Sequence, residues 1–278
     1  MFFSVRADTY ENGVDVMFRG LYTSALGMTT QMQRMDVVSN NIANVNTVGF
    51  KRDAVAAQAF SDRLAHRLDD PAITGVLRLL GRNHPMGLME PGVFIDEVFT
   101  DFSSGGLRST GGPLDLALTA PGFFAVTVNL YDGTEQEKFT RDGSFTLAAD
   151  GTLLDMEGSR VQGVGGGNIV IPVGNVTIAD NGRIYSNGEF VDQLRLVNFN
   201  NTESLRKTRG QYWVVTDESE MIAYEGRVEQ GFLENSNVNV VREMVELVAL
   251  ARAYEANARM VQVHDETMGR AVSEIARR

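Results

Sequence analysis

The side chains best suited to chemistry are three histidines, and their spacing does not favour a metal site. His66, His84 and His264 lie far apart and form no His-x-His or His-Glu-x-x-His pattern, the spacings that place two imidazoles on one ion. Cysteine, another common metal ligand, is missing from the 278 residues. The sequence therefore predicts no metal site, and it excludes disulfides and thiolate nucleophiles.

Aspartates followed by glycine are the next candidates, because such pairs occur in the oxygen-lined loops that bind calcium. No Asp-x-Asp/Asn-x-Asp/Asn-Gly run is present, and each pair stands alone between strand-like segments. Asp-Gly and Asn-Gly pairs tolerate the positive φ of tight hairpins. We therefore predict turns instead of ion sites at Asp132-Gly133, Asp142-Gly143, Asp150-Gly151, Asn181-Gly182 and Asn187-Gly188.

Two further motifs point away from catalysis. Residues 163–167 read GVGGG but lack the lysine and the serine or threonine of a phosphate loop, and they lead into a strand-like segment. No serine stands in a Gly-x-Ser-x-Gly context, so nothing supports a nucleophile elbow. We predict no catalytic residue and no cofactor, and hence no enzyme; a carboxylate pair across the β segments is the alternative that the sequence leaves open.

The acidic balance of the chain argues against a polyanionic partner. Its 36 acidic and 25 basic side chains give a formal charge of −11, whereas a phosphate backbone is normally met by a basic face. No apolar run approaches the roughly 18 residues of a membrane helix, and the first residues lack the basic and apolar regions of a cleaved secretory signal. We expect neither nucleic-acid binding nor membrane insertion.

Regular secondary structure must position the side chains considered above. The first periodic segment predicts an amphipathic helix from about Arg19 to Val45. Apolar residues recur there with the steps of a heptad stripe, which needs a partner helix. Its methionines suit a surface that fits more than one neighbour. Packing on the helix's own domain is an equally open alternative. The stripe consists of Leu21, Ala25, Met28, Met32, Met35 and Ile42.

A longer stripe predicts a C-terminal helix of about 38 residues from Asn239, roughly 55 Å long at 1.5 Å per residue. Ala251 and Ala258 would let another helix approach closely, while Glu243 and Glu246 fall off the stripe, where we expect solvent or charged neighbours. A compact domain needs no helix of that length, so we expect it to cover the other helix or further copies. The stripe comprises Val240, Met244, Leu247, Ala251, Tyr254, Ala258, Val261, Met268, Val272 and Ile275.

Between the helices the pattern changes to short apolar runs typical of strands. Such runs occupy residues 123–128, 169–171, 194–197 and 212–215, and the glycine-containing pairs described above separate many of them. Because the connections are short, we expect antiparallel pairing.

The chain therefore divides into parts of different character, and the predicted fold class is α+β. A mainly antiparallel all-β central domain is flanked by long terminal helices that pack as a coiled-coil-like assembly domain. We expect a leader at 1–18 that is disordered or precedes a true start at Met17. The helical assembly domain would comprise 19–60 and 231–278, an extended linker 61–92, and the β-rich domain 93–230.

Residues 39–51 read SNNIANVNTVGFK and predict the end of the first helix. The asparagines can hydrogen-bond exposed backbone where the helix stops, Gly49 can adopt the left-handed conformation, and Phe50 can turn back onto apolar surface. The same run resembles the N-terminal signature of the bacterial flagellar rod and hook proteins. It departs from that signature at Val48, where the family commonly has proline.

Three later stretches resemble the same family in order. Residues 110–124 look like the entry to its β-domain, residues 139–153 like its paired-strand signature, and residues 231–257 like its C-terminal signature. The resemblance covers the chain from about Met17 onward, apart from the linker. From the residues alone, the segment around Arg141 is first a hairpin turn and second a contact surface.

The resemblance implies a structural subunit of the flagellar basal-body rod, the drive shaft that transmits torque from motor to hook. It is nearest to the proximal rod type, with the distal rod second. The family's properties imply polymerisation through the terminal helices, export in unfolded form by the flagellar type III apparatus, and a place in the periplasmic rod. Implied partners are further copies, other axial proteins of rod and hook, the export apparatus and the surrounding rings.

The assembly interface implied by the stripes and the signature includes residues from both helices. A secreted β-domain that binds a ligand such as a glycan and dimerises through its helices is the alternative. It would need clustered aromatic residues around a pocket, and the chain has one tryptophan, Trp213. The predicted interface residues are Leu21, Ala25, Met28, Met32, Met35, Asn40, Asn41, Ile42, Asn44, Gly49, Phe50, Met244, Leu247, Ala251, Tyr254, Ala258 and Val261.

Overall fold

The computed structural model describes residues 5–59, 93–129, 133–208, 211–216, 220–275 and 277. Within this part the chain folds into two units. Unit 1 comprises the described parts of Met1–Ser39, Ala54–Phe99 and Arg242–Arg278, and unit 2 those of Asn40–Asp53 and Thr100–Val241. The predicted linker at 61–92 lies outside the described residues.

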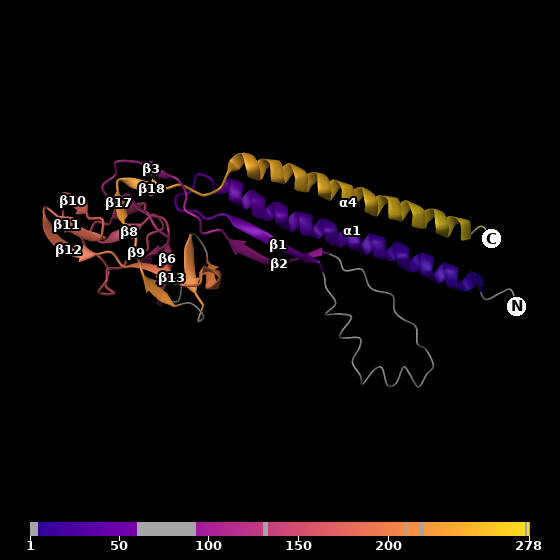
Figure 1. Ribbon diagram of the computed structural model, residues 1–278, viewed down its shortest axis with the longest axis horizontal. Helices are drawn as coiled ribbons and strands as arrows, with labels where there is room; N and C mark the ends of the chain where they lie inside the picture. The colour runs from indigo at the N-terminus through magenta and orange to yellow at the C-terminus, as the bar shows by residue number, and fades with distance from the viewer. Residues whose placement is uncertain are drawn as a thin grey trace, which may run out of the picture. The chain divides into compact units, whose positions relative to one another are not determined.

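Unit 1 is built mainly from two long helices, α1 (Val5–Ala43) and α4 (Val240–Ile275), with a two-stranded ribbon of β1 (Asp53–Ala59) and β2 (Val93–Thr100). The helices run antiparallel and side by side (Figure 1), and a Cβ added at Gly20 would meet His264 while one added at Gly27 would meet Asn257. Neither described helix is long and apolar enough to cross a membrane.

The helix boundaries agree with the sequence pattern at three of their four ends. Helix α4 begins one residue after the predicted start, and α1 ends two residues before the predicted end. The exception is the start of α1, which lies at Val5 and so extends the helix through much of the expected leader. Strand β1 was not predicted. Its sequence DAVAAQA is rich in alanine, which carries little strand signal.

Unit 2 is the β-rich part, and every pairing within it that has a defined register is antiparallel, as predicted. Its largest sheet has the strand order β14-β15-β6-β5-β9-β8-β7, and β13 joins β5 to β16. The strands are β5 (Phe123–Asn129), β6 (Glu135–Thr140), β7 (Phe145–Leu147), β8 (Leu153–Asp155), β9 (Arg160–Val161), β13 (Leu196–Phe199), β14 (Leu205–Lys207), β15 (Tyr212–Val215) and β16 (Met221–Ala223).

Smaller sheets complete the unit. A three-stranded meander pairs segments that are close in sequence, and two ribbons pair segments that are distant in sequence. The meander contains β10 (Val176–Ile178), β11 (Arg183–Ser186) and β12 (Glu189–Gln193). The ribbons pair β3 (Leu107–Ser109) with β18 (Phe232–Glu234) and β4 (Leu116–Leu118) with β17 (Val228–Gln230), and a short 3₁₀ helix, η1, covers Thr202–Ser204.

Strand β5 explains how unit 2 buries apolar residues on both of its faces. Successive side chains of a strand point to opposite sides. Phe124 and Val126 therefore lie in one core cluster, while Phe123 and Ala125 lie in a second one with Trp213. A strand that is covered on both sides has a continuous apolar run, as residues 123–126 do.

Two details of the β prediction were wrong. Residues 169–171 form no strand: Ile169 and Ile171 are buried, but the segment contributes only an isolated bridge from Val170 to Thr152. Gly143 is not among the residues with positive φ, unlike Gly151, Gly182 and Gly188. A Cβ at Gly143 would lie 1.8 Å from the carbonyl oxygen of Leu116, so close backbone approach requires glycine there.

The hairpin of β7 and β8 offers a test of the first core cluster. Leu153 is fully buried in it, while its register partner Leu147 is more than one-third exposed. We expect Leu153→Ala to lower the free energy of unfolding by about 2–5 kcal/mol through lost burial and a cavity, and Leu147→Ala to lower it by less than about 1 kcal/mol. Urea unfolding followed by Trp213 fluorescence measures both. Equal losses would contradict the assignment of the core.

Candidate functional site

The end of α1 leads the chain into a buried junction within unit 2. The Asn44 amide hydrogen-bonds the Asn40 carbonyl at 2.9 Å, and the Thr47 hydroxyl lies 3.2 Å from Asn44 Oδ1. Gly49 has a φ of 69°, which confirms that it adopts the left-handed conformation predicted from its position after the helix. These contacts turn the chain sharply within six residues of the last helical residue, Ala43.

Gly49 is also the point at which distant segments meet. Its N–H donates to the carbonyl oxygen of Glu234 at 2.8 Å. A Cβ at this position would lie 2.6 Å from the carbonyl oxygen of Arg141, so only glycine fits without displacing the backbone. The predicted helix cap is thus simultaneously a packing surface for residues from the β-rich and C-terminal segments.

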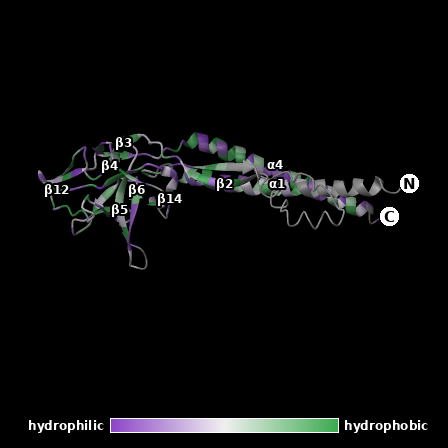
Figure 2. Cartoon of the chain, turned by 60° about the horizontal axis from the view of Figure 1, so that its bottom comes forward, coloured by the Kyte–Doolittle hydropathy of each residue, from purple (hydrophilic) through white to green (hydrophobic). Residues whose placement is uncertain are grey.

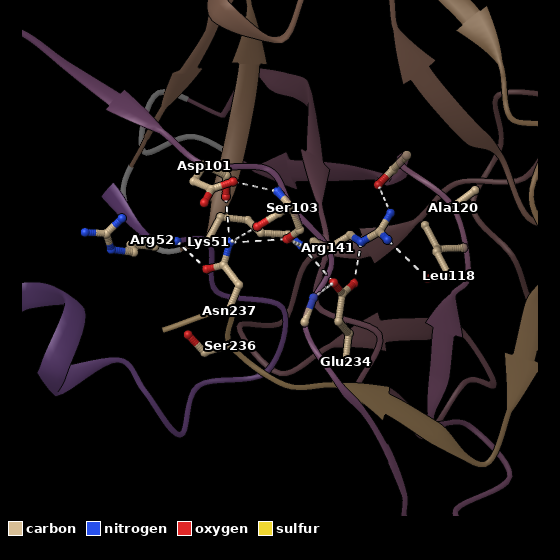
Figure 3. A network of polar contacts seen from close by, with 12 residues as sticks. Lys51, Arg52, Asp101, Ser103, Leu118, Ala120, Arg141, Glu234, Ser236 and Asn237 are labelled. Carbon is tan, nitrogen blue, oxygen red and sulfur yellow. Dashed lines mark hydrogen bonds and ion pairs between the residues drawn. The ribbon is translucent and has the colours of Figure 1, made fainter. Parts of the chain in front are cut away.

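Three charged side chains near these contacts form an ion cluster, shown in Figure 3 and called here the junction cluster: Lys51, Arg141 and Glu234. Lys51 Nζ lies 2.7 Å from Glu234 Oε1, and Arg141 Nε lies 2.5 Å from Glu234 Oε2. All three side chains are at most 3% exposed. Such charges are stable in the interior only when they are paired and hydrogen-bonded.

Backbone groups satisfy the rest of the cluster. Glu234 Oε1 also accepts the N–H of Gly105 at 2.8 Å, and Lys51 Nζ donates to the Ser103 carbonyl at 2.8 Å. The guanidinium of Arg141 donates to the carbonyls of Leu118 and Gly122. Two cations thus share one carboxylate, and the surplus positive charge faces carbonyl oxygens.

The environment of the cluster shifts the pKa values of Glu234 and Lys51. Burial raises the pKa of Glu234, but the charges of Arg141 and Lys51 outweigh burial, so that its pKa lies below the ordinary value of 4.5. Burial lowers the pKa of Lys51 despite the attraction of Glu234, and the neighbouring Arg141 charge lowers it further. The carboxylate is therefore ionised at neutral pH.

Asparagine side chains brace the backbone next to the cluster. Asn237 accepts the N–H of Arg52 at 2.8 Å and donates to the carbonyl of Asp101 at 2.8 Å. Asn41, which is buried, bonds both backbone groups of Asp53, its amide donating at 2.8 Å and its oxygen accepting at 3.0 Å. A side-chain amide can replace a missing strand partner in this way, because it carries both a donor and an acceptor.

Phe50 is buried, as expected from its place in the signature. The ammonium group of Lys207 lies 4.2 Å from the centre of its ring and 2.9 Å from Asp53 Oδ2. Lys207 is close enough for a cation–π contact. The aromatic side chain is therefore part of the fold of unit 2.

The apolar helix residues predicted to form the assembly interface have a different environment. None of them is buried in the single chain: Ala25, Met32 and Met244 are exposed, and the others are half-buried. The residues that the helices use to meet each other precede the stripe by one position, as Gly20, Gly27 and Arg34 precede Leu21, Met28 and Met35. One residue is about 100° of rotation on a helix.

One expectation about α4 needs correction. Glu243, expected off the stripe next to solvent or charged neighbours, is fully buried. Glu246 has the expected charged neighbour: it is half-buried and lies 4.0 Å from Arg34 of α1, because the face next to the stripe is the one that meets α1. A large exposed surface remains on the early part of α4, called here the exposed α4 patch: Met244, Val245 and Val248, which are 51%, 66% and 53% exposed.

The junction cluster itself was missed as a site. Its members stand within the signature runs, but their opposite charges are 183 and 93 residues apart in sequence, and no local pattern pairs them. Arg141 is neither in a hairpin turn nor at a surface, because its segment connects β6 and β7, which share a sheet but do not pair with each other, and its side chain is buried in the junction cluster. Among the described residues no group of His, Asp and Glu could hold a metal ion.

Comparison with known proteins shows to which protein family the chain is related. Three protein-family models match the chain. The family described as "Flagella basal body rod protein" matches residues 21–51, and the "Flagellar hook protein FlgE/F/G D1 domain" matches residues 117–186. The family described as "Flagellar basal body rod FlgEFG protein C-terminal" matches residues 229–274. The flagellar basal-body rod protein FlgG of Bacillus subtilis is 31% identical over 271 residues, which are 91% of this chain and 97% of that protein. The chain belongs to the flagellar basal-body rod protein family.

Other members of the rod protein family are about equally similar. The flagellar basal-body rod protein FlgF of Caulobacter vibrioides is 31% identical over 94% of this chain and 99% of its own length. The flagellar hook-basal body complex protein FlhO of Bacillus subtilis is 27% identical over 94% of this chain and 100% of its own length. Each of the matched segments contributes one charge to the junction cluster: Lys51, Arg141 and Glu234 in order.

The close approach at Gly49 predicts a large effect of a single methyl group. Gly49→Ala combines a left-handed backbone with a clash against Arg141, and we expect it to lower the free energy of unfolding by about 2–4 kcal/mol. Gly111→Ala is the control, because Gly111 has a φ of 71° but open space around a Cβ; it should cost only about 1 kcal/mol. Urea unfolding of both variants checks this, and equal costs would contradict it.

The lowered pKa of Glu234 predicts how stability responds to acid. A carboxyl with a depressed pKa in the folded state stabilises the fold fully above its unfolded value and loses that contribution as the pH falls through the folded pKa. We therefore expect the free energy of unfolding to decline below about pH 4.5, the ordinary value for this group. Glu234→Gln, less stable at neutral pH, should show a shallower decline, and parallel curves would be the contrary result.

Proposed function

We propose that this protein is a structural subunit of the bacterial flagellar basal-body rod and that it polymerises through its terminal helices. The proposal is supported by the family relationship over nine-tenths of the chain. The structural observation that carries it is the exposed α4 patch, where Met244, Val245 and Val248 stand on successive turns in water. Full burial of such a side chain is worth about 1.5–3 kcal/mol.

The contact between the helices favours this function, because it leaves the stripe residues of the predicted interface exposed or only half-buried. Small and polar residues meet there, including Gly20 against His264 and Gly27 against Asn257. In the described part of the chain, the buried Oε1 atom of Gln31 has no hydrogen-bond partner. Because only a few apolar residues of the described helices are buried in the single chain, further copies can bury apolar surface that the chain itself leaves exposed.

Assembly by such surfaces has a defined geometry. The stripes of α1 and α4 differ in sequence, so a contact between them on two copies is heterologous, and heterologous contacts that do not close produce helical polymers. Small residues such as Ala251 and Ala258 would allow close approach of the packed helices. The coiled-coil-like packing inferred from the heptad pattern belongs to this assembled state.

The proposal includes no catalysis. Every charge of the junction cluster is already paired, and the aromatic residues near Trp213 are core residues that pack on one another. A ligand-binding β-domain would present such side chains around a pocket. The buried aromatic cluster therefore favours a scaffold role for unit 2.

Location and partners follow from the same proposal. We place the protein in the periplasmic rod of the basal body, reached unfolded through the flagellar type III apparatus, where it would transmit torque from motor to hook. Its neighbours would be further copies, other axial proteins of rod and hook, and the surrounding rings. The proximal rod position remains our first choice and the distal position the second.

The exposed α4 patch provides the test. Val245→Glu places a charge at an exposed position, so the thermal unfolding of the monomer should change little, while burial of the patch between subunits would be opposed by the cost of desolvating the charge. We expect loss of swimming in soft agar when this variant replaces the wild-type copy, and basal bodies without a complete rod in electron micrographs.

Arg252→Gln, also exposed on α4, is the matched control, and cells that carry it should swim like the wild type. Glu246 is unsuitable for this purpose because it faces Arg34. Normal swimming with Val245→Glu would exclude the patch from the assembly interface.

A further inference from the structure

We propose that the junction cluster is a positioning device that fixes the two points at which the chain passes between the β-rich unit and its helices, and that rod assembly requires this fixation. The inference rests on the proposed function. It assigns Lys51, Arg141 and Glu234 a role in assembly although none of them is exposed.

The first argument is the place of the cluster in the chain. Unit 2 contains the last residues of α1, 40–43, and the first residues of α4, 240–241. Lys51 follows the end of α1 by eight residues (43 to 51), and Glu234 precedes α4 by six (234 to 240). Their bond of 2.7 Å therefore ties the exit of one helix to the entry of the other.

The second argument is the anchoring of this tie to the sheet. Arg141 binds Glu234 through Nε and uses its other nitrogens for the carbonyls of Leu118 and Gly122, which flank the connection from β4 to β5. Lys51 reaches the Ser103 carbonyl in the same way. A planar guanidinium with several fixed donors meets such a set of acceptors in only one orientation.

The third argument is that the cluster does not tolerate displacement of its side chains. Strand β18 pairs Leu233 with Arg108 and Glu234 with Leu107, and a shift by one residue would turn every side chain of the strand to the other face. An apolar core accommodates small displacements by repacking. A buried carboxylate that is shared by two cations does not, because any displaced partner becomes an unpaired buried charge.

A role confined to stability predicts something different. Buried ion clusters contribute little net stability compared with apolar side chains of similar volume, and replacing a whole cluster is often neutral or stabilising. If positioning is the function, the apolar replacement separates two properties: the chain keeps its stability and loses the fixed geometry.

The experiment uses the full chain and the triple variant Lys51→Met, Arg141→Met, Glu234→Leu. Because the sequence has no cysteine, cysteines introduced at the exposed positions 43 and 241 can be spin-labelled uniquely. We expect the triple variant to keep the urea midpoint of the wild type, the distribution of distances between the labels to broaden, and swimming to be lost in cells that lack the wild-type copy. An unchanged distribution or normal swimming would overturn the proposal.

A second variant decides the question if the triple variant does not fold. Arg141→Lys keeps the charge next to Glu234 but cannot also bind the Leu118 and Gly122 carbonyls. We therefore expect a folded monomer, a broadened distribution of distances between the spin labels, and loss of swimming; normal swimming overturns the proposal.

Expression of the unlabelled wild-type chain separates this proposal from the proposed function. If the wild-type chain fails to restore motility to the deletion strain, the rod function and the inference fall together; if it restores motility and the variants do so equally, only the inference falls.

Discussion

A single buried carboxylate, shared by two cations, is the constraint on which the junction of this protein depends. Glu234 cannot be stable in the interior without Lys51 and Arg141, and neither cation can be stable there without Glu234. Segments from the beginning, middle and end of the sequence must therefore arrive together. The Gly49 backbone supports the same meeting point, since its conformation and its missing Cβ admit Arg141 and Glu234.

The helices obey a different constraint, which is visible in the distribution of hydropathy. Figure 2 shows hydrophobic and hydrophilic residues interspersed along α4, and the faces are used unequally. The face that meets α1 includes Glu246, Asn257 and His264, while Val245 and Val248 remain in water. Folding of the chain thus buries a largely polar face together with a few apolar residues, and it leaves the exposed α4 patch in water.

The sequence predicted those features that local spacing encodes. Heptad spacing indicated both helices, a continuous apolar run indicated β5, and the position of Gly49 after the helix indicated its left-handed conformation. Long-range chemistry carried no such signal: nothing near Arg141 indicates a partner 93 residues away. Glu243 was misplaced for a related reason, because heptad spacing identifies the apolar stripe but not the neighbouring face that becomes buried.

Division of these roles between two units has a mechanical consequence. In the proposed rod subunit the helix ends must keep a fixed geometry, and apolar packing alone resists sliding weakly because alternative packings differ little in free energy. Charges in a low dielectric resist it strongly, since their attraction falls with distance and no water replaces a lost partner. Lys51, Arg141 and Glu234 all belong to unit 2, where α1 ends and α4 begins, so these directional interactions lie next to the helix ends whose geometry the proposal requires.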